Sequence, residues 1–262
     1  MRWTLSLALL SSLLLGASIE FKGKVEPFQQ WTIKSDVAGK VVKVRLDMEG
    51  RVGDDRPIVE LDTGDDLIKL RNSLTQLKLL KEEIKLQKEV VQKKLDLYNR
   101  IKDLKTKSLL EKDQRFFDYS GSYMTLLNLK QNLAQTEAEV ELLRRTIEKK
   151  RFKAPGLYIV KIYPRPGDFI GVGAPVLDVA DLNREKIVIF VPVSQIGEVK
   201  GAKVLINGHP SQFKLFKIWR VTDRQYITSY RVELVGKGLP VGKIVSIRFE
   251  KGKRGSFNSS NN

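Results

Sequence analysis

Apolar residues recur every seven positions through the middle of the chain. The row consists of Leu70, Leu77, Ile84, Val91 and Tyr98. Neither Pro nor Gly occurs between residues 65 and 107. A heptad row of this length predicts a long helix that packs against one partner.

The second row of the same helix is less apolar. Counting three residues back from the first row gives Leu67, Leu74 and Leu95, but also Lys81 and Lys88. We therefore expect a narrow and partly charged packing stripe, which needs only one partner helix.

The segment from about residue 112 to residue 150 carries a matching apolar row. Its members alternate three and four positions apart: Tyr119, Ser122, Leu126, Leu129, Leu133, Thr136, Val140, Leu143 and Ile147. The short stretch 107–111 is expected to reverse the chain, which predicts an antiparallel helical hairpin over 64–150. The alternative is a dimeric parallel coiled coil in which both halves run on as one rod, and Gly121 argues against it.

The two segments that flank the hairpin resemble each other. Gly39 and Gly50 are eleven residues apart, and so are Gly156 and Gly167. Each pair precedes a Pro followed by two branched apolar residues, at 57–59 and at 175–177. The pattern predicts two halves of one β-sandwich: N-terminal strands with the first half over 19–63, and the second half over 151–181. Chance similarity between two glycine-turn hairpins is the alternative.

Several β-branched runs follow Leu182 at the spacing of a small barrel. They are 186–193, 203–206, 213–220, 230–235 and 244–250. We expect a β-barrel domain over 182–250. The polar residues 251–262 are expected to form a disordered tail.

The N-terminus has the layout of a signal peptide over residues 1–18. Arg2 precedes an apolar run from Leu5 to Leu15, and three small residues follow at 16–18. The run is too short for a permanent membrane span, so export to the periplasm is expected. The alternative is a segment that stays attached as an amphipathic anchor.

Basic residues exceed acidic ones by 47 to 31, and the excess lies mainly in the last third of the chain. Residues 151–262 hold 19 Lys or Arg and 8 Asp or Glu. In an exported protein such charge favours contact with an anionic membrane surface at the inner membrane. Nucleic-acid binding is not expected, because the basic positions lack interleaved stacking aromatics.

The sequence offers no catalytic, metal or cofactor site. There is no cysteine, and the single histidine, His209, lies in an Asn-Gly-His-Pro turn. Acidic pairs such as Asp65 and Asp66 suit a solvated surface or a helix start. No phosphate-binding loop occurs, and the turn at 60–64 holds no lysine to carry a lipoyl or biotinyl group. We therefore do not expect an enzyme.

Taken together, residues 35–62 and 152–181 resemble the two lipoyl halves of the periplasmic adaptors, also called membrane fusion or HlyD-like proteins. Residues 234–250 are similar to the closing strands of that family's barrel, with its Leu-x-x-Gly turn at Leu239–Gly242. The resemblance implies a mixed α and β, elongated multidomain fold. In that fold a long antiparallel α-helical hairpin interrupts a split lipoyl-like β-sandwich, and a small β-barrel follows.

The resemblance also implies partners. Family members form homo-oligomeric rings in tripartite efflux or secretion systems, between an inner-membrane transporter and a TolC-like outer-membrane channel. The compact size favours a proton-driven transporter over an ATP-driven one. The alternative function is a coiled-coil envelope scaffold or tether without a transport role.

The family's channel-contacting motif at the hairpin tip is an Arg, a Leu four residues later and a Ser seven further on. Arg100 and Leu104 fit this motif, but Glu111 stands where the Ser would be, and Ser108 lies three residues earlier. Leu109 and Leu110 lie in a Lys- and Arg-rich turn, and as exposed side chains they are expected to insert into grooves between the helices of a channel. The alternative is that these leucines simply close the hairpin.

Overall fold

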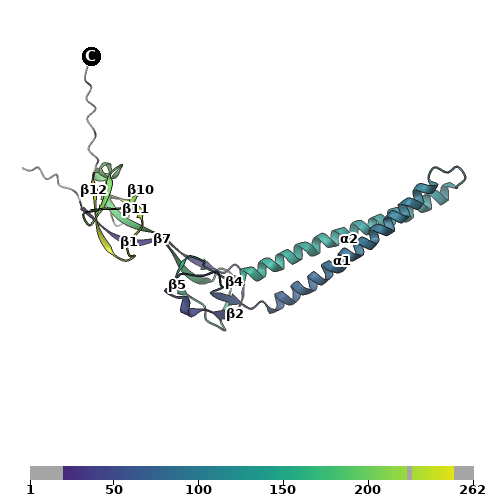
Figure 1. The fold of residues 1–262 in the computed structure, drawn as a ribbon, viewed down its shortest axis with the longest axis horizontal. Helices are drawn as coiled ribbons and strands as arrows, with labels where there is room; N and C mark the ends of the chain where they lie inside the picture. Colours follow the sequence, from purple (N-terminus) through teal and green to yellow (C-terminus); the bar gives the residue numbers. More distant parts are fainter. Residues whose placement is uncertain (1–19, 223–225, 251–262) are drawn as a thin grey trace, which may run out of the picture. The chain divides into compact units, whose positions relative to one another are not determined.

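The computed structural model describes residues 20–222 and 226–250. It confirms the mixed α and β fold, with a long antiparallel helical hairpin whose sequence is flanked by the strands of antiparallel β-sheets (Figure 1). The expected signal peptide (1–18) and the expected C-terminal tail (251–262) lie outside the described residues.

The chain divides into two compact units. The first comprises residues 32–179 and holds the β-sandwich and the hairpin. The second comprises residues 20–31 together with the segment from residue 180 onward. The sequence grouped residues 20–31 with the first sandwich half instead. The difference arises because strand β1 (Glu20–Lys34) pairs with β12 (Ile244–Glu250), which is more than 200 positions away in the sequence.

The sandwich of the first unit is built from short strands on both sides of the hairpin. One antiparallel sheet has the order β4-β3-β2-β6, and β5 pairs with β7. The bounds are β2 Gly39–Val44, β3 Val59–Leu61, β4 Arg151–Phe152, β5 Tyr158–Ile162, β6 Phe169–Ile170 and β7 Pro175–Pro192, with a 3-10 turn at Leu46–Met48.

The two halves of the sandwich share one core. Ile58 and Val59 from the first half pack with Ile159, Ile162 and other apolar residues of the second half in a single buried cluster. Burying these branched side chains removes apolar surface from water, which is the main force that joins the halves. The expected pairing of two distant segments into one module is therefore present.

Reciprocal hydrogen bonds also join the halves. The Gly50 N–H donates to the Ile159 carbonyl at 2.9 Å, and the Gly167 N–H donates to the Val41 carbonyl at 2.9 Å. Both glycines have a positive backbone φ, of 77° and 96°, which residues with a Cβ rarely adopt. The repeated glycines thus mark equivalent turns at which each half binds the other.

A carboxylate adds a further link between the halves. Asp178, in β7, accepts hydrogen bonds from the hydroxyls of Thr32 and Tyr163, both at 2.6 Å. These bonds stabilise the charged form, first from Thr32 and then from Tyr163, and so lower the pKa of Asp178. The same contact raises the pKa of Tyr163.

The hairpin consists of α1 (Gly64–Ile101) and α2 (Leu109–Lys149), which lie side by side (Figure 1). The predicted row on α2 is confirmed, because every member is buried or partly buried while most neighbouring positions are exposed. The first predicted row on α1 is also confirmed, with Ile84 and Val91 at its most buried points.

The second predicted row on α1 is wrong. Leu67 and Leu74 are 44% and 37% exposed, and the seam instead contains residues one position earlier in each heptad. These residues are Asp66, Ser73, Leu80, Gln87 and Lys94. In this register the side chain of Leu80 and the amide of Gln87 point toward α2. Lys81 lies beside the seam instead, where its amino group pairs with the Glu137 carboxylate at 3.3 Å.

Two polar side chains of α1 in the seam are bonded to the opposite helix. Gln87 Nε2 donates to the Ser122 carbonyl at 2.8 Å, and Lys94 Nζ donates to Ser122 Oγ at 2.6 Å. At the base, Lys150 Nζ lies 2.5 Å from Asp66 Oδ2 and also donates to the Asp62 carbonyl. Such specific polar contacts in a narrow seam fix the register of two helices.

The second unit is a small barrel-like sheet around its own core. Its strand order is β10-β11-β7-β1-β12-β8-β9. The remaining bounds are β8 Lys203–Ile206, β9 His209–Pro210, β10 Lys214–Thr222 and β11 Ser229–Gly236, with a short helical segment over Val193–Val199. Inward residues of these strands, such as Ile187, Val232 and Ile247, are completely buried.

Candidate functional site at the hairpin tip

The tip is a seven-residue loop, 102–108, that joins the two helices. The Lys102 N–H still bonds the Tyr98 carbonyl, and the Leu104 N–H donates to the Ile101 carbonyl at 3.1 Å. The Lys107 N–H then donates to the Leu104 carbonyl at 3.4 Å. Consecutive tight turns of this kind reverse the chain within a few residues.

The expected position of the reversal, 107–111, is wrong by several residues. The Glu111 N–H donates to Ser108 Oγ at 3.2 Å, so Ser108 caps α2 and the helix begins at Leu109. A serine followed three residues later by a glutamate is a signature of a helix start, which the sequence already contained.

This cap gives Ser108 and Glu111 structural roles. Ser108 satisfies a free N–H of the first turn, and the Glu111 carboxylate lies 2.8 Å from Lys107 Nζ. A carboxylate in the first turn also interacts favourably with the helix dipole. Both residues shape the tip, while neighbouring side chains remain open to solvent.

Three leucines of the tip are exposed to solvent. Leu109 is 75% exposed, Leu110 is 78% exposed and Leu104 is 45% exposed. Arg100, in the last turn of α1, is exposed as well. The structure thus brings all six predicted contact residues to one end of the hairpin.

Two phenylalanines extend the same apolar surface and were missed from the sequence. Phe117 is 65% exposed and Phe116 is 44% exposed, with the Phe116 ring 5.6 Å from the ring of Tyr98. They follow Leu109 and Leu110 by seven residues, which is two helical turns, so they lie on the same side of α2. That spacing was the available signal. We call Leu104, Leu109, Leu110, Phe116 and Phe117 the tip surface.

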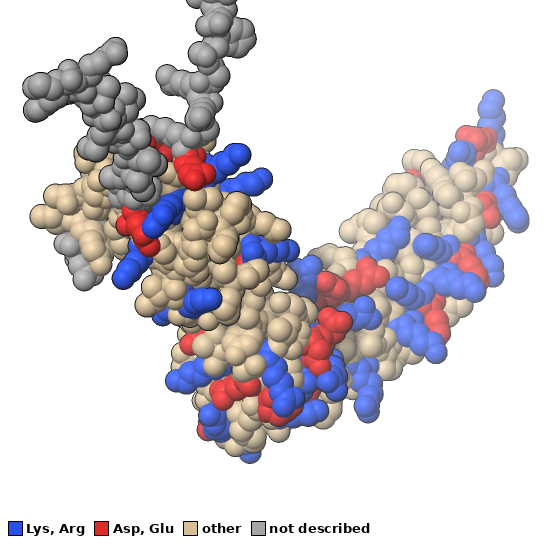
Figure 2. Space-filling model, turned by 60° about the vertical axis from the view of Figure 1, so that its left-hand side comes forward, with Lys and Arg blue, Asp and Glu red and all other residues tan. Residues whose placement is uncertain are grey.

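Charged residues surround the tip surface. Residues 100–118 hold six Lys or Arg and four Asp or Glu. Figure 2 shows that basic side chains, mixed with fewer acidic ones, also lie along the rest of the hairpin. An apolar centre with a charged rim is the usual composition of a protein-binding surface.

At its base, the hairpin leaves the sandwich at the turn over residues 62–64. Here β3 leads through Asp62 and Thr63 directly into α1, and Asp62 Oδ1 accepts the Gly64 N–H at 2.8 Å. The nearest lysine, Lys150, has its amino group bonded to Asp66 and is only 15% exposed.

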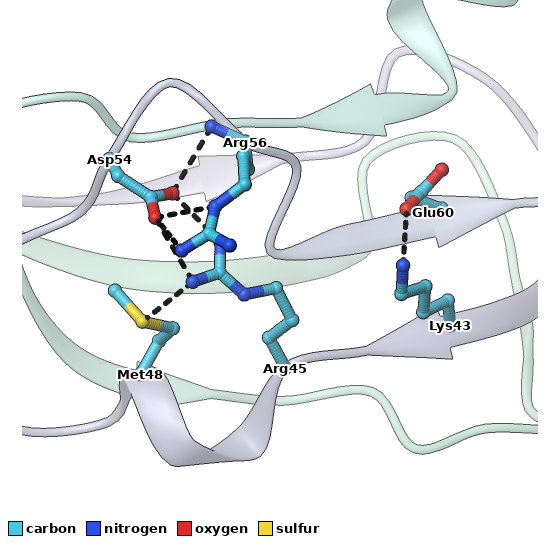
Figure 3. A network of polar contacts seen from close by, with 6 residues as sticks. All are labelled: Lys43, Arg45, Met48, Asp54, Arg56 and Glu60. Carbon is cyan, nitrogen blue, oxygen red and sulfur yellow. Dashed lines mark hydrogen bonds and ion pairs between the residues drawn. The ribbon is translucent and has the colours of Figure 1, made fainter.

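A cluster of charged residues around Asp54 stabilises part of the sandwich. Asp54 accepts hydrogen bonds from Arg45 and Arg56, at 2.7 Å and 2.6 Å, and Lys43 pairs with Glu60 at 3.6 Å (Figure 3). The bonds from Arg45 and then Arg56 hold the pKa of Asp54 well below its usual range. These contacts stabilise the 54–56 turn. Both oxygens of the Asp54 carboxylate already accept hydrogen bonds from Arg45 and Arg56.

His209 lies on the short edge strand β9, pairs with Ile206 and is exposed. Within the described residues no group of three His, Cys, Asp or Glu side chains is arranged to hold a metal ion. Across residues 20–222 and 226–250, no helix combines the length and apolarity that a membrane span requires.

Several solved structures share the fold of this chain. Solved structures match most of the chain: MacA from Actinobacillus actinomycetemcomitans aligns with 88% of this chain and 78% of its own, at 16% identity and a TM-score of 0.72. The membrane fusion protein Spr0693 from Streptococcus pneumoniae R6 aligns with 90% of this chain and all of its own, at 8% identity and a TM-score of 0.61.

A third match is a chimeric protein. A MacA-MexA chimeric protein, containing the Pseudomonas aeruginosa MexA α-hairpin domain, aligns with 89% of this chain and 81% of its own, at 15% identity and a TM-score of 0.61. No protein-family model matches the sequence, and no curated protein matches it. The chain therefore has the fold of the membrane fusion proteins, as the sequence resemblance implied.

Proposed function

We propose that this chain is a non-enzymatic periplasmic adaptor of a tripartite efflux or secretion system. In this role the tip surface binds a TolC-like outer-membrane channel, while the β units bind an inner-membrane transporter. The observation that carries the proposal is the group of exposed leucines and phenylalanines at the end of a long hairpin in a membrane fusion protein fold.

The length of the hairpin supports this role. With 38 residues in α1 and 41 in α2, each helix is about 60 Å long at about 1.5 Å per residue. A protein that only had to stabilise its own β-sandwich would gain nothing from carrying apolar side chains that far. Exposed anchors of this kind are instead typical of binding sites.

Ring formation is part of the proposal, because one hairpin cannot enclose a passage. Phe169 and Val172 in the sandwich are 75% and 72% exposed, and they suit contact with a second copy. We favour a proton-driven transporter because the chain is compact. Native mass spectrometry of the wild-type protein and of Phe169→Asp tests the ring, since the substitution is expected to shift the population toward monomer.

The main test is affinity isolation of the tagged protein from cross-linked membranes. We expect both a transporter and a channel to accompany the wild-type chain. The variant Leu109→Asp/Leu110→Asp is expected to lose the channel and keep the transporter. The matched control is Leu142→Asp, which changes an equally exposed leucine (65%) far from the tip.

Isolation of neither partner would contradict the proposal and favour the scaffold or tether function. Equal channel recovery from the tip variant and the Leu142→Asp control would show that the tip surface is not the contact.

A further inference from the structure

The outer face of strands β7, β10 and β11 in the second unit carries aromatic and basic side chains together. Val232 and Leu234 of β11 are buried in the core, so the alternate residues Arg231 and Glu233 lie on the other face, where their side chains form an ion pair at 2.8 Å. Arg231 is paired in register with Phe190 of β7, and the ring of Tyr226 stacks on Phe190 at 4.0 Å.

Strand β10 adds an indole and more cations to this face. Lys217 Nζ lies 3.5 Å from the centre of the Trp219 ring, and the Arg231 guanidinium lies 6.0 Å from it. We call Phe190, Lys217, Trp219, Tyr226 and Arg231 the basic–aromatic face. The β10 segment 214–222 contains three Lys or Arg and no acidic residue.

Irregular pairing pushes these side chains outward. The register of β10 against β11 shifts between Leu215 and Lys217, and again between Ile218 and Thr222. In the second shift, residues 219–221 lie opposite a single residue of β11. Such bulges re-aim side chains at sheet edges. As a result Trp219 is 41% exposed and Val221 is 80% exposed.

Edge protection alone does not explain this composition. Bulges and lysines do keep an edge strand from pairing with another chain. That purpose is not served by exposing Trp219, Val221 and, after the turn, Ile227, which is 73% exposed. Exposed apolar side chains beside clustered cations indicate a surface that binds something both apolar and anionic.

We propose that the basic–aromatic face, extended by Val221 and Ile227, docks on an anionic phospholipid surface. Trp and Tyr side chains favour the boundary between lipid tails and head groups, and Lys and Arg are attracted to anionic head groups. The face lies toward the Pro192 end of β7, where Arg231 is paired with Phe190. The inference deepens the proposed function and rests on its location beside a membrane.

The test is sedimentation of the full chain with phospholipid vesicles. We expect vesicles of phosphatidylethanolamine and phosphatidylglycerol to bind the wild-type protein more strongly than phosphatidylcholine vesicles, with binding that weakens as salt is raised. Lys217→Gln/Arg220→Gln is expected to lower the partition coefficient about tenfold, because each cation near an anionic surface strengthens binding several-fold. Trp219→Ala is expected to lower it several-fold on both kinds of vesicle.

Matched controls separate this face from general charge and general hydrophobicity. Lys85→Gln/Lys130→Gln removes two exposed cations from the hairpin, and Tyr123→Ala removes a ring of matching exposure (42%) from the hairpin. Both are expected to bind vesicles like the wild type. Residues 1–19 are identical in all variants, so they cannot produce the difference. Circular dichroism checks that each variant is folded.

Equal binding by wild type, Lys217→Gln/Arg220→Gln and Trp219→Ala would overturn the proposal, as would equal effects from the control variants. A protein partner would then be the remaining occupant of the face. The assay contains neither transporter nor channel, so its failure leaves the adaptor function standing. Conversely, the tip variant Leu109→Asp/Leu110→Asp is expected to lose the channel and still bind vesicles like the wild type.

Discussion

The sandwich core and the hairpin seam show two ways in which distant segments are held together. In the sandwich, Ile58, Ile159 and Leu177 have no exposed surface. In the seam, even the best-buried residues, Leu126 and Val140, remain 5% exposed, and the rows on either side are open. A side chain between two sheets is covered on all sides, whereas a side chain between two helices is covered on one.

The difference teaches where stability and specificity come from in this chain. The shared apolar core supplies the free energy that joins the two sandwich halves. The seam replaces apolar contacts with polar ones at Ser73, Ser122 and Thr136, all of which are buried. Of these three, Ser122 is bonded to Gln87 and Lys94 of the opposite helix and so fixes the helix register while adding little stability, whereas the Thr136 hydroxyl bonds the Asn132 carbonyl of its own helix.

The largest expected effect comes from truncating the shared core. Ile159→Ala is expected to lower the free energy of unfolding of the sandwich by about 3 to 4 kcal/mol, because it removes buried methyl groups and leaves a cavity. The neighbour Val160 is 41% exposed, so Val160→Ala is expected to cost about 0.5 kcal/mol or less. Urea denaturation followed by circular dichroism measures both. Equal losses would refute the contrast between the two positions.

A matching truncation in the seam is expected to cost less. Ile84→Ala should lower the local stability of the hairpin by about 2 kcal/mol, since Ile84 is 6% exposed and its surroundings can partly close the gap. Leu86, on the open side of α1, is 65% exposed, and Leu86→Ala is the control. Amide hydrogen exchange along α1 reports the change. A loss as large as that of Ile159→Ala would mean that the seam is not the weaker element.

The ion pair at the base of the hairpin is expected to matter less again. Lys150→Met should cost about 1 to 2 kcal/mol, because it leaves the mostly covered carboxylate of Asp66 without its partner. The adjacent Lys149 pairs with Asp36 at 3.5 Å on the open surface, so Lys149→Met is expected to cost about 0.5 kcal/mol or less. Thermal unfolding of both variants measures the difference, and a reversed order would contradict the assigned roles.

The smallest effect concerns pH. The pKa of Asp178 is lowered by the hydroxyls of Thr32 and Tyr163, so its contribution to stability is present above its unfolded pKa of about 4. That contribution is lost as the pH falls through the lower, folded pKa. Wild type and Asp178→Asn should therefore differ in unfolding midpoint at pH 7 and converge in acid. A gap that stays constant down to pH 2 would exclude this linkage.

Much of the hairpin could be predicted because its signal is local and repeated. The α2 row came out correctly from the alternating three- and four-residue spacing. On α1 two rows were possible, because Leu67 and Leu74 compete with Ser73 and Leu80. The row with Leu67 and Leu74 contains more leucines, which favoured it, but the structure exposes these two leucines and buries Ser73 and Leu80. Only the partners on α2, such as Ser122 for Gln87, decide between them.

The remaining differences come from contacts that a linear pattern does not show. Residues 20–31 contain Gly23 and Pro27 and give no sign that their partner strand lies at 244–250. The predicted position of the chain reversal is wrong for another reason. Ser108 was interpreted as a binding residue, whereas its side chain caps the first turn of α2. The basic–aromatic face depends on bulges in β10, which only the strand register reveals.

Site-specific photo-cross-linking in cells tests the central claim most directly, namely that the tip surface contacts an outer-membrane channel. A photoreactive residue at Leu110 (78% exposed) is compared with one at Leu142 (65% exposed), on the same helix. The account predicts a cross-link to a channel protein from position 110 and none from position 142. A channel cross-link from position 142 alone, or from neither position, would contradict it.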